Sequence, residues 1–238
     1  MSRTDSSGLP LSVVSVMLFL LATRPLHAEA PPGQAPAAKD KPWVNLFASG
    51  TLELWKTDDG KPVTRGWNIE NGVLIHSGHS GNILTRKNYS DFELMFQWKL
   101  APGANSGVKY RMKDYGHRRL GCEYQLIDDK GYKYSLAQWQ RSGALYGLYP
   151  PPPDSQPKPP GQWNTARIVA IGSHLEHWLN GKRIVSAEAG SDDWKQRVLH
   201  SKFDETPDFG QNPSGPIMIQ DHGGTVWIRN MAVRVRGE

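Results

Sequence analysis

The sequence contains very little cysteine and almost no helical periodicity. Cys122 is the single cysteine among 238 residues, so no internal disulfide can form. Apolar residues recur with a period of two rather than 3.6, which argues against a helix bundle and favours strands. We therefore expect a β-structure that is held together by its core, with Cys122 as a small buried residue.

Several catalytic signatures are also missing. The chain has no nucleophile elbow, no H-E-x-x-H zinc motif, no P-loop and no dinucleotide fingerprint. The formal net charge is +5, but lysines and arginines are scattered among acidic residues instead of forming a block. We therefore expect no nucleic-acid partner, and we interpret the charge as a mild basic bias of a solvated surface.

The N-terminus has the pattern of an export signal. Arg3 precedes the short apolar run LSVVSVMLFLLA, and AEA at residues 28–30 fits a small-x-small cleavage site. The run is too short to span a membrane comfortably and no second run follows, so no transmembrane anchor is expected in the mature protein. We predict a signal peptide over residues 1–30, a disordered Pro/Ala-rich leader over residues 31–42 and one folded domain over residues 43–236. The predicted location is periplasmic or secreted.

Short alternating strands and tight turns fill the predicted domain. FELMFQWKL, residues 92–100, alternates most clearly, and Asn180-Gly181 is the strongest hairpin turn. The Pro-rich residues 149–161 cannot form a central strand and predict a surface loop, while residues 191–203 could hold one helical turn. Ten or more short strands favour an all-β sandwich or jelly roll of two antiparallel sheets.

Two strand-like stretches carry polar residues that share a face. In CEYQLIDD, Tyr124 and Leu126 form the natural core-facing pair, which leaves Glu123 and Gln125 together on the other face. They are ordinary surface residues if that face is the sandwich exterior, and convergent cleft residues if it is concave. In NSGVKYRM, Arg111 could pair with Glu123 across neighbouring strands or bind a substrate oxygen.

The segment GPIMIQDHGGTVWIRN, with apolar runs on either side of a polar turn, predicts a hairpin. His222 could transfer protons near neutral pH, and Asp221 could orient it, or both could bind a metal. Neighbours on a strand point to opposite faces, so a direct pair requires the turn to rotate one of them. A simple bend is the alternative interpretation.

Three further histidines have simpler interpretations. His177 alternates with Leu175 and Leu179, which predicts a hydrogen-bonded core histidine. His76 and His79 lie in the polar turn IHSGHSG, and we expect both at the surface.

The motifs in chain order are NLF…LW, NSGVKYR, EYQLIDD, GALYGLYPP, WNTARIV, HWLNGK, SKF…FG and IQDHGGTVWIRN. This ordered set resembles the 3-keto-disaccharide hydrolase family, from about Trp43 to Val235. The opening LFASGTLELW departs from the family's usual LFNGKDLSGW, but it contains none of the candidate polar residues. The resemblance implies a concanavalin-like jelly-roll β-sandwich of two antiparallel sheets, with a concave face that binds sugar.

The resemblance also implies an exported enzyme that acts on a small carbohydrate, a 3-keto-glycoside. A carbonyl at C3 acidifies the proton on C2, so a base can remove it, the C1 substituent can leave by elimination, and water can then add. His222 suits the base or a metal ligand, Glu123 the second proton-transfer group or a ligand, and Arg111 the stabilisation of the enolate oxygen. No cofactor is identified, and a divalent metal at His222 and Glu123 stays open.

Substrate binding is predicted for six more side chains. Those suited to orientation and to sugar hydroxyls are Gln125, Asp221 and Asn105, and those suited to aromatic walls are Tyr110, Trp139 and Tyr146. Three alternatives remain at this stage. One is an ordinary β-glucanase-like glycosidase with two carboxylates, another is a lectin-like sugar-binding module without catalysis, and the third is a structural domain without a ligand.

Overall fold

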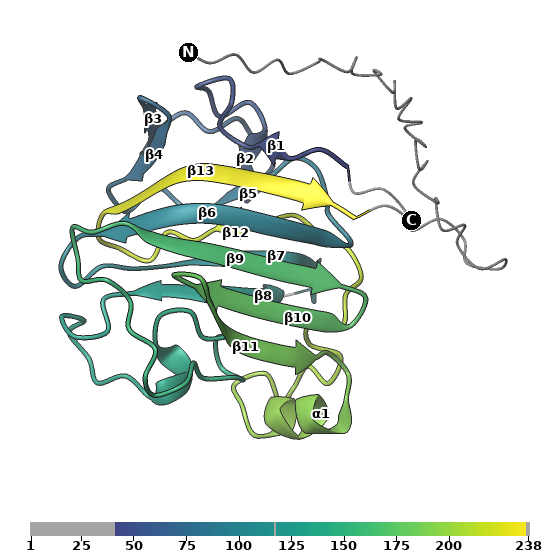
Figure 1. Cartoon of the computed structure of the whole chain (residues 1–238). Coiled ribbons are helices and arrows are strands. Elements are labelled where there is room, and N and C mark those ends of the chain that lie inside the picture. Colours follow the sequence, from purple (N-terminus) through teal and green to yellow (C-terminus); the bar gives the residue numbers. More distant parts are fainter. Residues whose placement is uncertain (1–40, 117, 237–238) are drawn as a thin grey trace, which may run out of the picture. The chain divides into compact units, whose positions relative to one another are not determined.

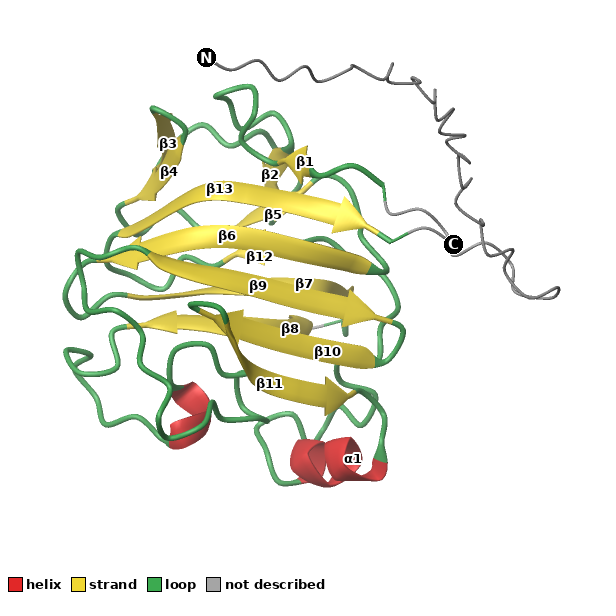
Figure 2. Ribbon diagram, viewed as in Figure 1, coloured by secondary structure: helices red, strands yellow, loops and turns green. Residues whose placement is uncertain are grey.

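The computed structural model of the chain describes residues 41–116 and 118–236. The predicted signal peptide over residues 1–30 lies outside the described residues, as do residues 31–40 of the predicted leader. The described chain forms two antiparallel sheets that face each other as a jelly-roll β-sandwich (Figures 1 and 2). The predicted fold class is confirmed.

The front sheet in Figure 1 has eight strands in the order β11-β10-β9-β6-β13-β4-β3, and β1 pairs with β13. The strands are β1 (Val44–Asn45), β3 (Trp67–Glu70), β4 (Val73–His76), β6 (Phe92–Leu100), β9 (Asn164–Ile171), β10 (His174–Leu179), β11 (Lys182–Glu188) and β13 (Val226–Val235). Asn180 and Gly181 join β10 to β11 with φ of 49° and 84°, which is the geometry of a type I′ turn. The predicted hairpin is confirmed.

The second sheet has five strands in the order β2-β5-β12-β7-β8. The strands are β2 (Trp55–Thr57), β5 (Ile83–Thr85), β7 (Asn105–Asp114), β8 (Arg119–Ile127) and β12 (Met218–Ile219). The free edge of β8 is covered by the chain that follows it, because Gln125 N donates to Ala144 O at 3.2 Å and Tyr146 N donates to Glu123 O at 3.0 Å. This coverage protects an edge that would otherwise expose unpaired backbone groups.

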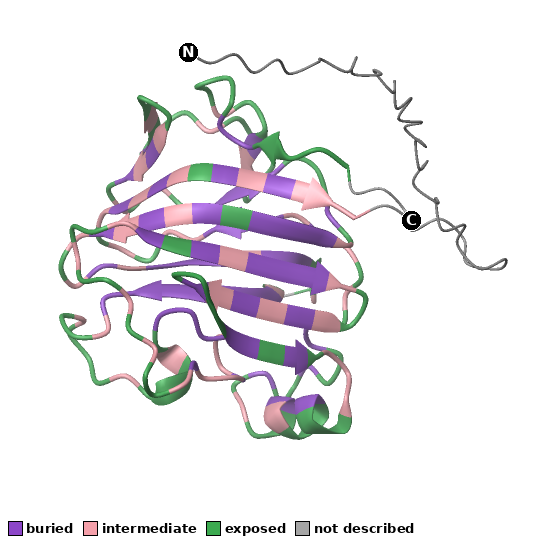
Figure 3. Ribbon diagram, in the orientation of Figure 1, coloured by how far each residue is buried: buried purple, intermediate pink, exposed green. Residues whose placement is uncertain are grey.

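The core lies between the sheets and follows the alternation of the sequence. On β6 the side chains of Phe92, Leu94, Phe96, Trp98 and Leu100 are each at most 3% exposed. Buried and exposed bands alternate along the front strands in Figure 3. Full burial of one such side chain stabilises the fold by about 1.5–3 kcal/mol, so this strand anchors the sandwich.

Cys122 and His177 both lie in this core, as predicted. Cys122 is free and buried, and loss of hydration raises its pKa to about 12. His177 is buried between Gly143 O, 2.9 Å from Nδ1, and Tyr110 OH, 3.0 Å from Nε2. Burial lowers the pKa of His177 to about 4, so the ring is a neutral, hydrogen-bonded core group at pH 7.

Little of the described chain is helical. Helix α1 (Asp192–Leu199) begins after Ser191, whose side chain accepts from Trp194 N, and it buries the Trp194 ring. It is longer than the single predicted turn. Residues 149–161 form no strand, which confirms the predicted loop, and η1 (Gln138–Gln140) is a short 3₁₀ turn. Within the described residues, no helix is long and apolar enough to cross a membrane.

The hairpin predicted around residues 217–228 is wrong. Strand β12 pairs with β5 and β7, whereas β13 pairs with β6 and β4 in the opposite sheet. The polar turn therefore crosses from one sheet to the other. A local pattern of apolar, turn and apolar residues predicts the two strands but does not determine which sheet each one joins.

Candidate active site

The outer face of the five-stranded sheet carries polar side chains of β7 and β8. Val108 and Tyr124 point from these strands into the core, while Lys109 and Glu123 pair in register and face outward. Lys109 Nζ lies 3.5 Å from Glu123 Oε2. Because Glu123 is only 7% exposed, this face holds a nearly buried carboxyl group beside an ammonium group.

Gln220 and Gly107 determine how the Glu123 carboxyl group is held. With its amide oriented to suit both neighbours, Gln220 donates to Glu123 Oε1 at 3.2 Å and accepts from Lys109 Nζ at 3.3 Å. A Cβ atom at position 107 would overlap Glu123 Oε1, so a larger residue there would require the carboxyl group to move. The carboxyl group is therefore positioned by packing as well as by hydrogen bonds.

Burial and the neighbouring charges act in opposite directions on the pKa of Glu123, and burial has the larger effect. Burial raises the pKa of Glu123, and the positive charges of Lys109 and Lys202 act against this rise. Loss of hydration lowers the pKa of Lys202; Glu123 acts against this shift, while Lys109 and Arg118 add to it. A carboxyl group and an ammonium group with pKa values shifted towards each other are typical of sites that transfer protons.

His222 reaches the same face because side chains alternate after β12. Met218 points away from the main core and Ile219 points into it, so Gln220 and His222 follow Met218 to the outer face. The backbone stays paired with β7, since Gln220 N donates to Gly107 O at 2.9 Å. The alternation of side chains and the pairing with β7 therefore place the His222 imidazole on the face that carries Glu123.

The ring of His222 is exposed and lies in a positive field. Partial loss of hydration and the charges of Lys109, Lys202 and Lys133 lower the pKa of His222, and Asp221 opposes them. The imidazole is therefore neutral at pH 7. A neutral imidazole is available as a general base.

Asp221 points away from His222 and anchors the turn. Its carboxylate accepts from the three backbone N–H groups of residues 79–81 at 2.7 to 3.2 Å, and it lies 2.8 Å from His76 Nε2. Although burial acts in the opposite direction, these contacts hold the pKa of Asp221 well below its ordinary value. Asp221 thus holds the turn in place. This geometry does not favour the predicted contact between Asp221 and sugar hydroxyls.

His76 was expected at the surface, and that prediction is wrong. Its ring stacks on Trp67 with centroids 3.8 Å apart, and Nδ1 lies 2.8 Å from Gly66 O. His79 is exposed, as predicted. The local sequence around His76 does not reveal its burial, because the Asp221 carboxylate that contacts it comes from a distant segment.

Two amides border the site at the start of β7. Gln125 Nε2 donates to Asn105 Oδ1 at 3.1 Å, and Asn105 Nδ2 donates to Tyr132 OH at 3.4 Å. Asn105 N donates to Gly223 O at 3.3 Å, which links this pair to the turn that carries His222. The structure therefore brings the predicted residues Gln125 and Asn105 together beside Glu123 and His222.

Trp139 and Tyr146 lie in the segment that covers the edge of β8. Their rings meet edge to face with centroids 5.6 Å apart, and Lys202 Nζ lies 4.2 Å from the Tyr146 centroid. Trp139 is 38% exposed. Because Lys202 also acts on Glu123, these two rings border the site and can provide an apolar wall for a sugar ring.

Arg111 does not join this group, and its predicted pairing with Glu123 is wrong. A bulge interrupts β7 at Arg111, which adopts φ of 51°. The buried guanidinium donates to the carbonyls of Ser90 and Gly172 and to Asp91 Oδ1 at 3.1 Å. The bulge breaks the two-residue alternation on which the prediction depended, so the side chain ties the two sheets together instead.

Tyr110 also lies away from the outer face. Its ring is fully buried and its hydroxyl contacts His177 in the core, so the predicted substrate contact is wrong. Tyr110 shares its strand face with Val108, which is also fully buried.

The sequence interpretation missed Lys109, Lys202 and Gln220. Lys109 shares the outward face with the predicted residues, and its alternation was the available signal. Gln220 stands two residues before His222, a spacing that marks a shared strand face. Lys202 lies in a loop after α1, where no local pattern indicates its neighbours.

The donor set does not fit a divalent metal held by protein side chains. Over residues 41–116 and 118–236, no three His, Cys, Asp or Glu side chains gather at one point. The candidate ligands Glu123 and His222 both lie in the field of Lys109 and Lys202. A divalent cation would add positive charge to that field, so the metal alternative is not supported by these residues.

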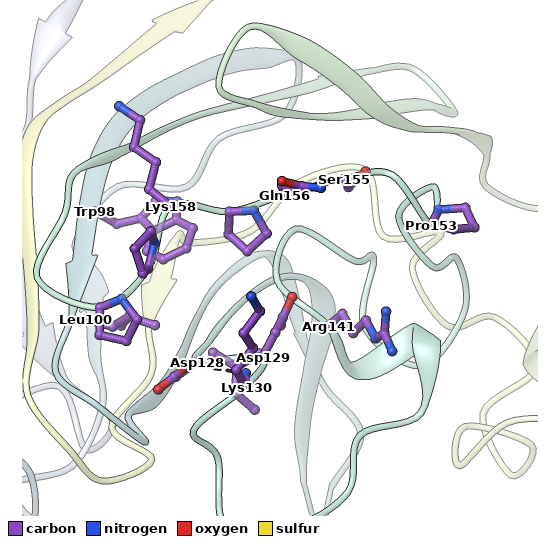
Figure 4. A pocket seen from close by; sticks show the side chains of 14 residues that line it. Trp98, Leu100, Asp128, Asp129, Lys130, Arg141, Pro153, Ser155, Gln156 and Lys158 are labelled. Carbon is purple, nitrogen blue, oxygen red and sulfur yellow. Dashed lines mark hydrogen bonds between the residues drawn. The ribbon is translucent and has the colours of Figure 1, made fainter.

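A separate cavity of about 520 Å³ lies beside the ends of β6 and β8 (Figure 4). Trp98, Asp129 and Arg141 line it, together with residues 153 and 155–160 of the Pro-rich loop. Neither Glu123 nor His222 is among its lining residues. The cavity is therefore distinct from the candidate active site.

The fold and this polar site together define a class: jelly-roll proteins with acid–base groups on the outer face of one sheet. Residues 42–234 match the family of the 3-keto-alpha-glucoside-1,2-lyase-like domain, and the chain belongs to that family.

Individual relatives agree with this assignment. A 3-keto-disaccharide hydrolase of Bacteroides thetaiotaomicron is 27% identical over 81% of this chain and 78% of its own. A crystal structure of a candidate glycosyl hydrolase from Parabacteroides distasonis is 35% identical, with a TM-score of 0.75 over 80% of this chain and 92% of its own. A second one from that organism is 27% identical, with a TM-score of 0.66 over 82% and 100%. These similarities support a carbohydrate-acting enzyme.

Proposed function

We propose that the protein is an exported enzyme that cleaves 3-keto-glycosides at the outer face of its five-stranded sheet. The observation that supports this most is the placement of Glu123, nearly buried beside Lys109 and Gln220. Neutral His222 lies in the field of Lys109 and Lys202 at the same site. Elimination next to a carbonyl needs a base, an acid and positive charge at the developing oxygen. This face offers all three.

The first step is removal of the C2 proton. The unprotonated ring nitrogen of His222 takes it, and the bonding electrons form an enediolate with the C3 carbonyl. Lys109 and Lys202 supply positive charge where the enediolate oxygen develops. Fixed charges of this kind stabilise a transition state more strongly in a partly desolvated site than in water.

The second step is loss of the C1 substituent. Its C1–O bond breaks, and Glu123 donates a proton to the departing oxygen, a role that its raised pKa suits. The proton on the exposed His222 ring then exchanges with solvent. Water adds to C1 of the unsaturated sugar, with Glu123 taking a proton from the water and His222 donating a solvent-derived proton to C2. The sum of the steps is hydrolysis of the glycosidic bond.

The remaining residues suit substrate binding. Trp139 and Tyr146 can stack on a sugar ring, and Gln125 and Asn105 can bond to its hydroxyls. We propose export to the periplasm or outside the cell because the N-terminal pattern is typical of a secretory signal.

A turnover assay with purified protein tests the proposal. The substrates are 3-keto-trehalose, 3-keto-lactose and a 3-keto-glucoside, each beside its unoxidised parent and each with and without a chelator. We expect cleavage of oxidised substrates only, unchanged by the chelator. Cleavage of the unoxidised parents would indicate an ordinary glycosidase, and binding without cleavage of any of them would indicate a sugar-binding module.

A further inference from the structure

A hollow of about 380 Å³ continues the outer face of the five-stranded sheet beyond Lys109. Met112 and Met218 provide its apolar floor, and Arg118 and Arg119 line its wall. Lys109 belongs both to this hollow, named here the Arg118 hollow, and to the Glu123 site. A volume at the lower end of the range for ligand pockets, about 300–1,000 Å³, suits one sugar unit next to the reacting one.

The carboxylates that line the Arg118 hollow already have partners. Asp58 Oδ2 accepts from Asn82 Nδ2 at 2.9 Å, and Asp58 Oδ1 lies 3.7 Å from Arg119 Nη1. Asp114 Oδ1 accepts from Gly116 N at 2.8 Å. These groups therefore leave the charge of Arg118 without a direct counterion.

Arg118 is the exception in this wall. Its Nη2 donates to Thr206 Oγ1 at 3.4 Å, its Nε is buried without a hydrogen-bond partner, and no carboxylate of the described chain forms an ion pair with it. The planar fork of guanidinium donors matches the two oxygens of a carboxylate or sulfate. Lys109 and Lys202 add positive charge nearby.

We propose that the Arg118 hollow binds an anionic oxygen group, a carboxylate or a sulfate ester, on the substrate, so that acidic glycosides are the preferred ligands. The consequence for catalysis rests on the proposed function. The binding itself does not, because an unoxidised acidic sugar should also bind.

Calorimetry with unoxidised sugars tests this binding without requiring turnover. The probes are methyl β-D-glucuronide, methyl β-D-glucoside 6-sulfate and neutral methyl β-D-glucoside, at one fixed low salt concentration. We expect one or both charged probes to bind about 10- to 100-fold more tightly than the neutral one, which is the effect of charge-assisted hydrogen bonds. Which charged probe binds identifies the anionic group.

Three variants show whether Arg118 is responsible. Arg118→Met should bring the charged and neutral probes to equal affinity, and Arg118→Lys should leave an intermediate preference because it keeps charge but not two adjacent donors. Arg183→Met, on β11 of the other sheet, is the control for net charge and should keep the full preference. Equal affinities in the wild type, undetectable binding of every probe, or equal loss in Arg118→Met and Arg183→Met would overturn the proposal.

Discussion

Glu93 and Glu123 are both nearly buried carboxyl groups on the outer faces of the two sheets, and they differ in their partners. Glu93, on β6, is 1% exposed and lies 2.5 to 2.7 Å from guanidinium nitrogens of Arg167, Arg234 and Arg236. Although burial acts in the opposite direction, these arginines hold the pKa of Glu93 below its ordinary value. Glu93 is therefore a structural group that is charged at neutral pH.

Glu123 is buried to a similar degree, but among the described residues it has only Lys109, at 3.5 Å, as an ion-pair partner. Its pKa is raised because one ammonium contact and the field of Lys202 do not offset the loss of hydration. The comparison shows that burial alone does not determine the role of a carboxyl group. A fully paired carboxylate stabilises the fold, while an incompletely paired one can exchange a proton.

The largest effect is expected from Glu123→Gln. The amide keeps the size of the side chain but cannot donate and recover a proton, so kcat on a 3-keto-glycoside should fall by about 10²–10⁴-fold. The thermal unfolding midpoint should stay close to that of the wild type. Steady-state kinetics and calorimetry measure the two quantities.

Glu93→Gln is the matched control and should show the reverse. Loss of the carboxylate removes its ion pairs with Arg167, Arg234 and Arg236 and should lower the free energy of unfolding by about 1–3 kcal/mol. The kcat of the folded variant should not change. Equal losses of kcat in the two variants would show that Glu123 has no special role.

Gly107→Ala tests the packing around Glu123 without removing a charge. The new Cβ would displace the carboxyl group from Lys109 and Gln220, and kcat should fall by about 10–100-fold. Full activity in a folded variant would show that this carboxyl position is not required.

The outward orientation of Glu123 could be predicted from the sequence, because side-chain alternation is a local property. It placed Glu123 and Gln125 opposite Tyr124 and Leu126, and the structure agrees. It failed at Arg111, because a bulge there depends on pairing with the next strand rather than on local composition.

Non-local contacts account for the remaining errors. The partner of Asp221 is His76, more than a hundred residues earlier, and neither residue indicates the other in the sequence. Lys202 approaches Glu123 from a loop whose path is determined by the packing of α1. Contacts of this type follow from tertiary packing, so they could be seen only in the structure.

A smaller effect is expected from Asp221→Asn. The folded-state pKa of Asp221 is depressed, so its carboxylate contributes stability above the unfolded pKa of about 3.9, and this contribution is lost as the pH falls below that value. The variant should lose about 1–3 kcal/mol at neutral pH and show a flatter stability profile in acid. Denaturant unfolding from pH 2 to 7 measures this, and parallel profiles for variant and wild type would contradict it.

The smallest effect is expected on the pH profile of Lys202→Met. The charge of Lys202 lowers the pKa of both His222 and Glu123, so removing it should shift both limbs of kcat/KM to higher pH, by less than about one unit. A shift to lower pH, or no shift, would show that Lys202 does not act on these groups. The surface variant Lys182→Met serves as the control.

Deuterium incorporation at C2 tests the central claim most directly. Wild type and His222→Ala are each mixed with 3-keto-trehalose in heavy water and followed by proton NMR, with free 3-keto-glucose as the control for exchange after release. The wild type should release glucose and 3-keto-glucose that carries deuterium at C2, while His222→Ala should neither cleave nor exchange. Cleavage that retains the C2 hydrogen, or full cleavage by His222→Ala, would contradict the account.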